Sequence, residues 1–202
     1  MWHCEPAPSV GRVSVSTTAN TFRPVEITEH WNNRSMSTVD DKGDGRFNVW
    51  RNSFPAEHLP RPGERVTVGG VPFDFPPATS AGDNARCAGQ FVTLPPGHFD
   101  WIRLLASAER RVEDTVALHF ADGQVDFEAI RVSDFWAAPA CFGETLAYRT
   151  PVMHYPHHVQ PRVEAMLWSQ RVPVTRDATL TGLRLPNNRA LHIFALTLQE
   201  ST

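Results

Sequence analysis

Three histidines and a tyrosine lie close together in residues 153–161, which read MHYPHHVQP. Neutral imidazole nitrogens bind Zn, Fe, Ni or Cu, and histidine also transfers protons near neutral pH. If the protein is an enzyme, we therefore expect His154, His157 and His158, supported by Tyr155, to carry acid–base chemistry. In an extended strand His154 and His158 share one face while His157 points away, so the three do not form a ready-made triad. A transition-metal site, a rim that contacts a ligand and a plain polar hairpin loop all remain open.

A second group of candidate residues precedes Pro55, in the stretch FNVWRNSFP. Trp50 offers a ring that packs on the apolar face of a sugar, while Arg51 and Asn52 offer donors and an acceptor for its hydroxyls. The aromatic residues of this stretch are equally suited to filling the core.

Polar residues also gather in GDNARCAGQ and at the end of RVSDFW. Asp83 and Asn84 are suited to an Asx-turn, and Arg86 either pairs with Asp83 or faces a ligand. Trp136, at the end of a strand, is expected to cover the core rather than to form an exposed platform. The residues we expect to contact a ligand are Trp50, Arg51, Asn52, Arg86, His154 and His158.

Carboxylates in DDKGDG, chiefly Asp41 and Asp44, are oxygen ligands of the type that calcium prefers. The spacing does not match an EF-hand, because no terminal Glu follows in register. A solvated acidic turn is the alternative interpretation.

Sequence signatures of several enzyme classes are missing from the chain. It contains no GxSxG, GxxxxGK[ST], GxGxxG or HExxH motif. The adjacent carboxylates Glu113 and Asp114 point to opposite faces of a strand, which is not the geometry of a glycosidase.

Composition places the chain among ordered globular proteins of one domain, with 202 residues, 41% hydrophobic and 20% charged. The formal net charge of −3 argues against nucleic acid or an anionic membrane as a partner. Lys42 is the only lysine, so nearly all basic side chains are arginines, whose planar forks suit carboxylate, phosphate or polyol ligands. The N-terminal residues show neither a basic segment nor an apolar one, so we expect no signal peptide and a cytoplasmic location.

The three cysteines, Cys4, Cys87 and Cys141, have no CxxC spacing. This pattern fits neither a disulfide framework nor a zinc ribbon. We expect Cys87 and Cys141 to be reduced core residues, with a bridge between them as the alternative.

Short segments with β periodicity recur along the chain and no convincing amphipathic helix interrupts them. Gly69-Gly70 and Asp122-Gly123 are hairpin turns between alternating arms, and the strand after Asp122-Gly123 shows a slip that suggests a bulge. The pattern predicts an all-β, antiparallel, jelly-roll-like β-sandwich over residues 23–202, preceded by a poorly ordered arm at 1–22. The expected strands occupy 25–28, 89–95, 99–108, 145–153, 163–174, 178–186 and 190–199, and the expected hairpins occupy 64–75 and 114–134.

The order of these segments resembles a galactose-binding-like β-sandwich domain of the carbohydrate-binding-module type, as appended to bacterial glycoside hydrolases. The resemblance covers about residues 24–198 and rests on VEITEHWNNRSMS, GDGRFNVWRNSFPAEHLP, VGGVPFDFP, GDNARCAGQFVTLP, WIRLLASA, LHFADGQ, RVSDFW and LRLPNNRALHIFALTL. It implies recognition of a sugar or a glycosylated small molecule by loops at one end of the sandwich, and a structural calcium near the first strands. An enzyme of small-molecule (secondary) metabolism that uses the histidine loop, and a protein–protein adaptor, are the alternatives.

Overall fold

The computed structural model describes residues 20–77, 79, 81–136 and 139–201, and in these residues the protein is built from strands. The strands are β1 (Phe22–Val25), β2 (Met36–Ser37), β3 (Phe54–Pro55), β4 (Arg65–Val68), β5 (Val71–Asp74), β6 (Ala85–Arg86), β7 (Phe91–Gly97), β8 (Phe99–Ala108), β9 (Val112–Phe120), β10 (Val125–Val132), β11 (Thr145–Tyr155), β12 (His158–Pro173), β13 (Leu180–Arg184) and β14 (Leu191–Glu200). Three 3₁₀ helices of one turn accompany them: η1 (Thr28–His30), η2 (Lys42–Asp44) and η3 (Ala56–His58). None of the described helices is long and apolar enough to cross a membrane.

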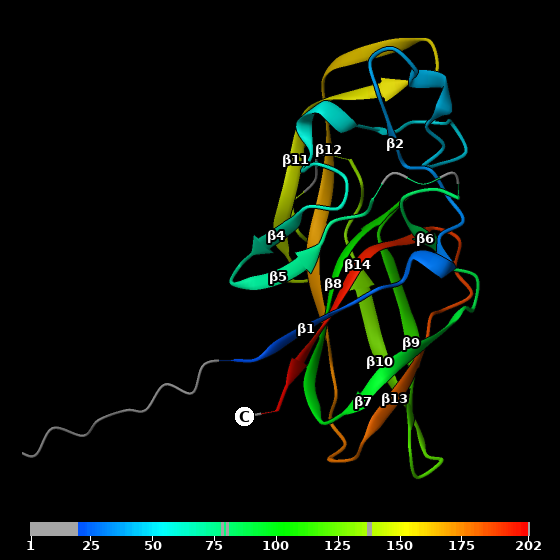
Figure 1. The fold of residues 1–202 in the computed structure, drawn as a ribbon. Coiled ribbons are helices and arrows are strands. Elements are labelled where there is room, and N and C mark those ends of the chain that lie inside the picture. The colour runs from blue at the N-terminus through cyan, green and yellow to red at the C-terminus, as the bar shows by residue number, and fades with distance from the viewer. Residues whose placement is uncertain (1–19, 78, 80, 137–138, 202) are drawn as a thin grey trace, which may run out of the picture.

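Two sheets pack face to face (Figure 1). One has the order β1-β14-β8-β12-β11, with β6 also paired to β14, and the other has the order β10-β9-β13-β7. From β7 to β14 the chain passes back and forth between the sheets, and every strand pair within them is antiparallel. The predicted all-β antiparallel sandwich is therefore confirmed.

Both predicted hairpins form at the expected glycines. Gly69 and Gly70 join β4 to β5 with φ of 57° and 83°, and Gly123 follows β9 with φ of 84°, values that glycine adopts without steric cost. The predicted bulge after Asp122-Gly123 is wrong, because β10 pairs with β9 in continuous register. Its apolar residues simply change face: Phe127 is 72% exposed, whereas Ile130 is buried.

The first strand lies earlier than the sequence pattern indicated. β1 ends at Val25, where it pairs with Leu196 of β14, and a 3₁₀ turn follows at Thr28. The strand predicted at 25–28 was wrong because pairing with β14, not local alternation, sets the position of this edge strand. Phe22 of the predicted arm already belongs to the sheet, and residues 1–19 of that arm lie outside the described residues.

The six-stranded sheet is covered on both faces. One hydrophobic cluster fills the space between the two sheets, and a second lies between the outer face of the six-stranded sheet and the segment from β2 to β5. This double cover explains why residues 191–199 of β14 are all buried. Cys87 is buried in the first cluster as predicted, whereas Cys141 is exposed, which corrects the prediction for that residue. The two cysteines do not form a disulfide with each other.

Candidate functional site

Four segments meet around a cavity of about 710 Å³, a volume typical of small-molecule sites. They are the loop before β3, the turn between β8 and β9, the residues after β10 and the end of β11. The lining residues are Trp50, Asn52, Glu109, Arg110, Arg111, Asp134, Trp136 and Tyr155.

The loop before β3 is held by its own polar groups. The amide oxygen of Asn48 accepts hydrogen bonds from the backbone N–H groups of Trp50 and Asn52, both at 3.1 Å. The backbone N–H of Phe47 donates to the carbonyl of Asn52 at 2.9 Å. Phe47 and Phe54 are fully buried, whereas Trp50 is 52% exposed. The aromatic residues of this stretch therefore divide between core and cavity.

Asn52 lines the cavity and carries an unmet hydrogen-bonding group. Its side chain is fully buried, and neither its amide nitrogen nor its amide oxygen has a partner among the described residues. Burying such a group without a partner costs about 1–3 kcal/mol. A ligand that carries both a donor and an acceptor, such as a hydroxyl group, matches this side chain.

The segment after β10 supplies Asp134 and Trp136. Phe135 between them is fully buried and stacks on Phe47 with a centroid distance of 4.2 Å, which joins this segment to the loop before β3. The backbone N–H of Trp136 donates to Asp134 Oδ1 at 3.0 Å. The sequence pattern predicted that Trp136 covers the core. In the structure Trp136 is half-buried and also lines the cavity. Burial raises the pKa of Asp134, and the Trp136 N–H and Arg110 only partly oppose that rise.

The turn between β8 and β9 contributes charge. Burial by itself would raise the pKa of Glu109, but the neighbouring His192 and Arg86 outweigh it and lower that pKa. The guanidinium of Arg86 binds Glu109 and the carbonyl of Arg189, so Arg86 positions a lining residue and does not line the cavity itself. In the described part of the chain no carboxylate forms an ion pair with Arg110 or Arg111, so the rim carries cationic groups.

Asp83 does not pair with Arg86, which corrects that alternative. Its carboxylate accepts hydrogen bonds from the backbone N–H groups of Ser35 and Met36 and from the Ser35 hydroxyl. Arg51 turns to the carbonyl of Gly43 and is not among the lining residues.

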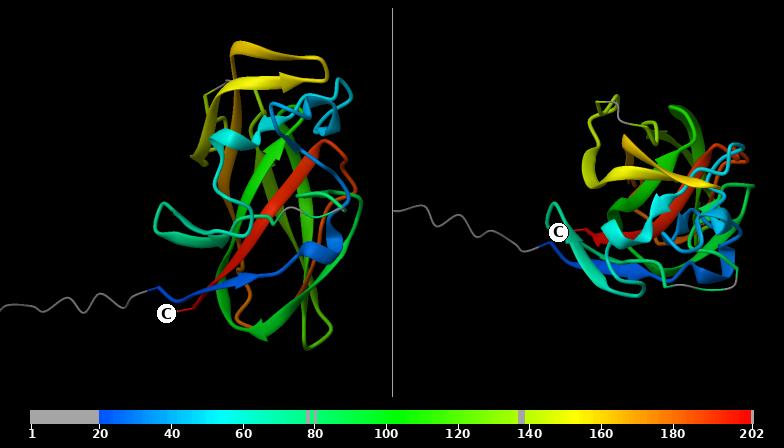
Figure 2. Two further views of the ribbon diagram at one scale, coloured as in Figure 1. Left: turned by 45° about the horizontal axis from the view of Figure 1, so that its top comes forward. Right: turned by 90° about the horizontal axis from the view of Figure 1, so that it is seen from above.

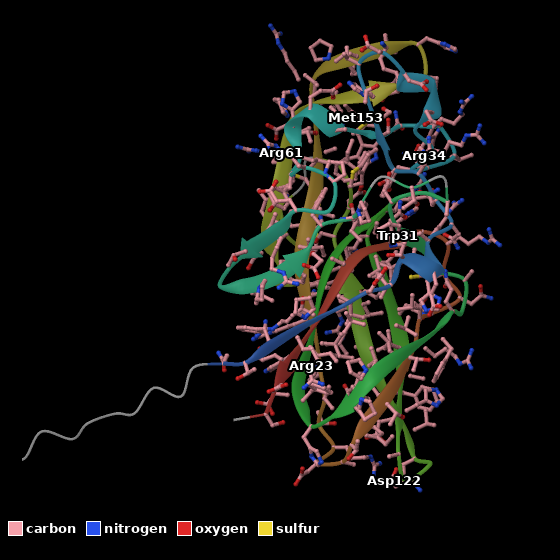
Figure 3. The ribbon with its side chains drawn as sticks, in the orientation of Figure 1. Arg23, Trp31, Arg34, Arg61, Asp122 and Met153 are labelled. Atoms are coloured by element: carbon pink, nitrogen blue, oxygen red, sulfur yellow. The ribbon has the colours of Figure 1, made fainter. Side chains whose placement is uncertain are left out.

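The histidine-rich stretch is the tip of the β11–β12 hairpin, at one end of the molecule (Figure 2). Met153 lies at this end in Figure 3, opposite Asp122. Tyr155 pairs with His158 across the hairpin, and His154 pairs with Val159. Residues of one pair share a face, so the prediction that His154 and His158 share a face was wrong: the turn at 156–157 reverses the chain.

The histidines therefore occupy different environments. His154 is buried, and its Nδ1 lies 2.9 Å from the Ser37 hydroxyl; burial lowers its pKa. His158 is exposed and stacks on Tyr155 with a centroid distance of 4.9 Å, and His157 is exposed as well. Of the four residues in this predicted catalytic set, the cavity includes Tyr155 and none of the histidines.

Asp41 and Asp44 line another cavity, of about 460 Å³. Asp44 is paired with Arg34. Within the described ranges no group of three or more His, Cys, Asp or Glu side chains is arranged to hold a metal ion. Calcium takes six to eight oxygen ligands. Asp83 lines the same cavity, but its carboxylate accepts backbone N–H groups. Three carboxylates, one paired with an arginine and one bonded to the backbone, fall short of the calcium set, so the calcium prediction gains no support from this geometry.

Sequence reasoning had singled out Trp50, Asn52 and Tyr155, and these three converge on one cavity. It missed the turn at 109–111, whose signal was three consecutive charged residues between two apolar strands.

Comparison with known proteins identifies a family for the chain. A family model described as an AziU2-like beta-sandwich domain covers residues 20–202. No curated protein matches the chain.

Proposed function

The chain belongs to the AziU2-like beta-sandwich domain family, and we propose that it is a binding domain for a sugar or a glycosylated small molecule. The ligand lies in the cavity lined by Trp50, Trp136 and Tyr155. The sandwich fold by itself does not define a function, so the proposal rests on the chemistry of this cavity.

The observation that carries the proposal is the combination of aromatic side chains with a buried, unpartnered amide in one cavity. A pyranose has an apolar face that packs on an aromatic ring, and hydroxyl groups around its edge. Trp50 is exposed enough to receive such a face. The buried amide of Asn52, which has no partner among the described residues, is able to pair with a hydroxyl group as donor and as acceptor.

Charged groups around the cavity suit the remaining hydroxyls. Asp134 accepts hydrogen bonds, and Arg110 and Arg111 donate them. The resemblance of the chain to carbohydrate-binding modules of bacterial glycoside hydrolases supports the same ligand class.

A glycan array of monosaccharides and oligosaccharides, followed by calorimetric titration of the best binder, tests the proposal. We expect Trp50→Ala and Asn52→Ala each to weaken binding about 10- to 100-fold, which corresponds to about 1–3 kcal/mol. Phe127→Ala is the matched control, because Phe127 is an exposed aromatic residue of β10 and does not line the cavity. The proposal fails if no glycan binds, or if the Trp50 variant and the control bind equally well.

A small-molecule enzyme is the second candidate, favoured by the raised pKa of Asp134 inside the cavity. In this candidate Asp134 supplies the proton and Tyr155 contacts the substrate, while the buried His154 supports the hairpin. Catalysis would be favoured over binding alone if the wild type chemically changes a bound glycan and Asp134→Asn does not change it.

A further inference from the structure

Outside this cavity, two arginines lie opposite each other in the six-stranded sheet. Arg103 of β8 and Arg171 of β12 are register partners in an antiparallel pair, so their side chains leave the same face. Leu105, two residues after Arg103, packs in the outer hydrophobic cluster, so this face is the outer one. Directly opposed like charges destabilise a sheet, and such a pair requires a compensating interaction.

No carboxylate of the described residues neutralises this pair. Within the described residues, neither Arg103 nor Arg171 forms an ion pair. Arg103 donates two hydrogen bonds to Gln199 Oε1, at 3.0 and 2.6 Å, but that acceptor is uncharged. Burial and the nearby Arg171 lower the pKa of Arg103. Two positive charges therefore remain on one small area of the sheet.

Trp101 holds the two guanidinium groups close together. The ring lies 4.3 Å from the Arg171 guanidinium carbon and 5.5 Å from that of Arg103. Stacking on an aromatic ring orients a guanidinium group and leaves the N–H groups at its edges able to donate, although two of those of Arg103 already donate to Gln199. The two arginines are thus fixed in position before any ligand arrives.

The arginines line a cavity of about 260 Å³ beside the β4–β5 hairpin. Ser169 and Thr145 add hydroxyl groups to its wall, whereas the side chain of Gln170 is bonded to the carbonyl of Arg131 and the backbone N–H of Arg171. Glu144 also lines it, but its carboxylate accepts N–H groups from the backbone of Ser133 and Phe142, at 2.7 and 2.8 Å. The negative charge of Glu144 is therefore directed at the backbone and not at the arginines.

We propose that Arg103 and Arg171 form a binding site for a phosphate group, either free or carried by a small molecule. A phosphate with a charge of about −1.5 to −2 balances both arginines, whereas a single carboxylate balances one. The cavity shares no lining residue with the proposed sugar site, so the two proposals stand independently.

Thermal unfolding with inorganic phosphate, compared with chloride at the same ionic strength, tests this proposal. For the wild type we expect the Tm to rise by about 3–6 °C at ten times the Kd. In Arg171→Gln this rise should be lost, while the Tm without phosphate should equal or exceed that of the wild type because the repulsion is relieved. Glycerol phosphate and glycerol, used at matched concentrations, distinguish an esterified phosphate from the free ion.

Arg184→Gln is the matched control. Arg184 stacks on Phe91 at 5.4 Å in the other sheet, so this variant also loses a stacked arginine but should keep the phosphate effect. The proposal is overturned if phosphate acts no differently from chloride on the wild type, or if Arg171→Gln keeps the full rise in Tm.

Discussion

Two buried asparagines provide a sharp test of the candidate site, because only one of them is satisfied by the protein. Asn52 and Asn84 are both fully buried. The amide nitrogen of Asn84 donates to the Asn33 carbonyl and side chain, both at 3.1 Å, and to Asp83 Oδ1 at 2.8 Å. Its amide oxygen lies 2.8 Å from His192 Nδ1. The amide of Asn52 has no such partners among the described residues.

Substitution by alanine should therefore affect the two positions differently. Asn84→Ala leaves groups of Asp83 and His192 buried without their partner, and we expect the free energy of unfolding to fall by about 3 kcal/mol or more. Asn52→Ala leaves a small void, worth about 1 kcal/mol, but it removes an unsatisfied amide that costs about 1–3 kcal/mol. We expect Asn52→Ala to lie within about 1 kcal/mol of the wild type, or to be more stable.

Guanidinium chloride unfolding, followed by circular dichroism, measures both variants against the wild type with the m-value as a check on two-state behaviour. The glycan titration then measures binding for the stable Asn52 variant. For Asn52→Ala we expect little loss of stability together with weaker glycan binding. A loss of stability in Asn52→Ala as large as that in Asn84→Ala would refute it, because Asn52 would then be paired within the folded protein.

Two further predictions concern the fold and its response to pH. Gly82→Ala should destabilise the protein much more than Gly123→Ala, as measured by chemical unfolding. Both glycines have positive φ, but of the two only Gly82 lies so close to the Asn33 carbonyl oxygen that an added Cβ would clash with it. Equal losses of stability would contradict this. Burial lowers the pKa of His154 and His192 below 6.5. In acid the unfolded state therefore binds more protons than the folded state does. The stability that the protein has above pH 6.5 should decline as the pH falls. His154→Asn should lose less stability than the wild type between pH 7.5 and 5.5, measured by urea midpoints, and an unchanged loss would argue against a role for this histidine.

The sandwich was predictable from the sequence because its signals are local. Alternating apolar residues and the turns at Gly69-Gly70 and Asp122-Gly123 place β4, β5, β9 and β10 within a residue or two. These features depend on backbone torsions and on the two-residue period of a strand, both of which are determined by residues that are neighbours in the sequence.

The candidate site was predictable only in part. The chemistry of Trp50 and Asn52 indicated a binding role, but their position beside Trp136 depends on packing between Phe47 and Phe135, which are far apart in the chain. His154 was singled out by type and spacing, yet the register of the hairpin buries it against Ser37.

The sequence by itself determined the fold class, the hairpin turns and the types of side chain available for binding. The tertiary structure decided which of those side chains share a cavity, and it brought Arg103 opposite Arg171 across two strands. The physical reason is that strand register is set by contacts between distant segments. A shift of one residue in that register moves every side chain of a strand to the other face, and local periodicity does not encode which partner a strand will find.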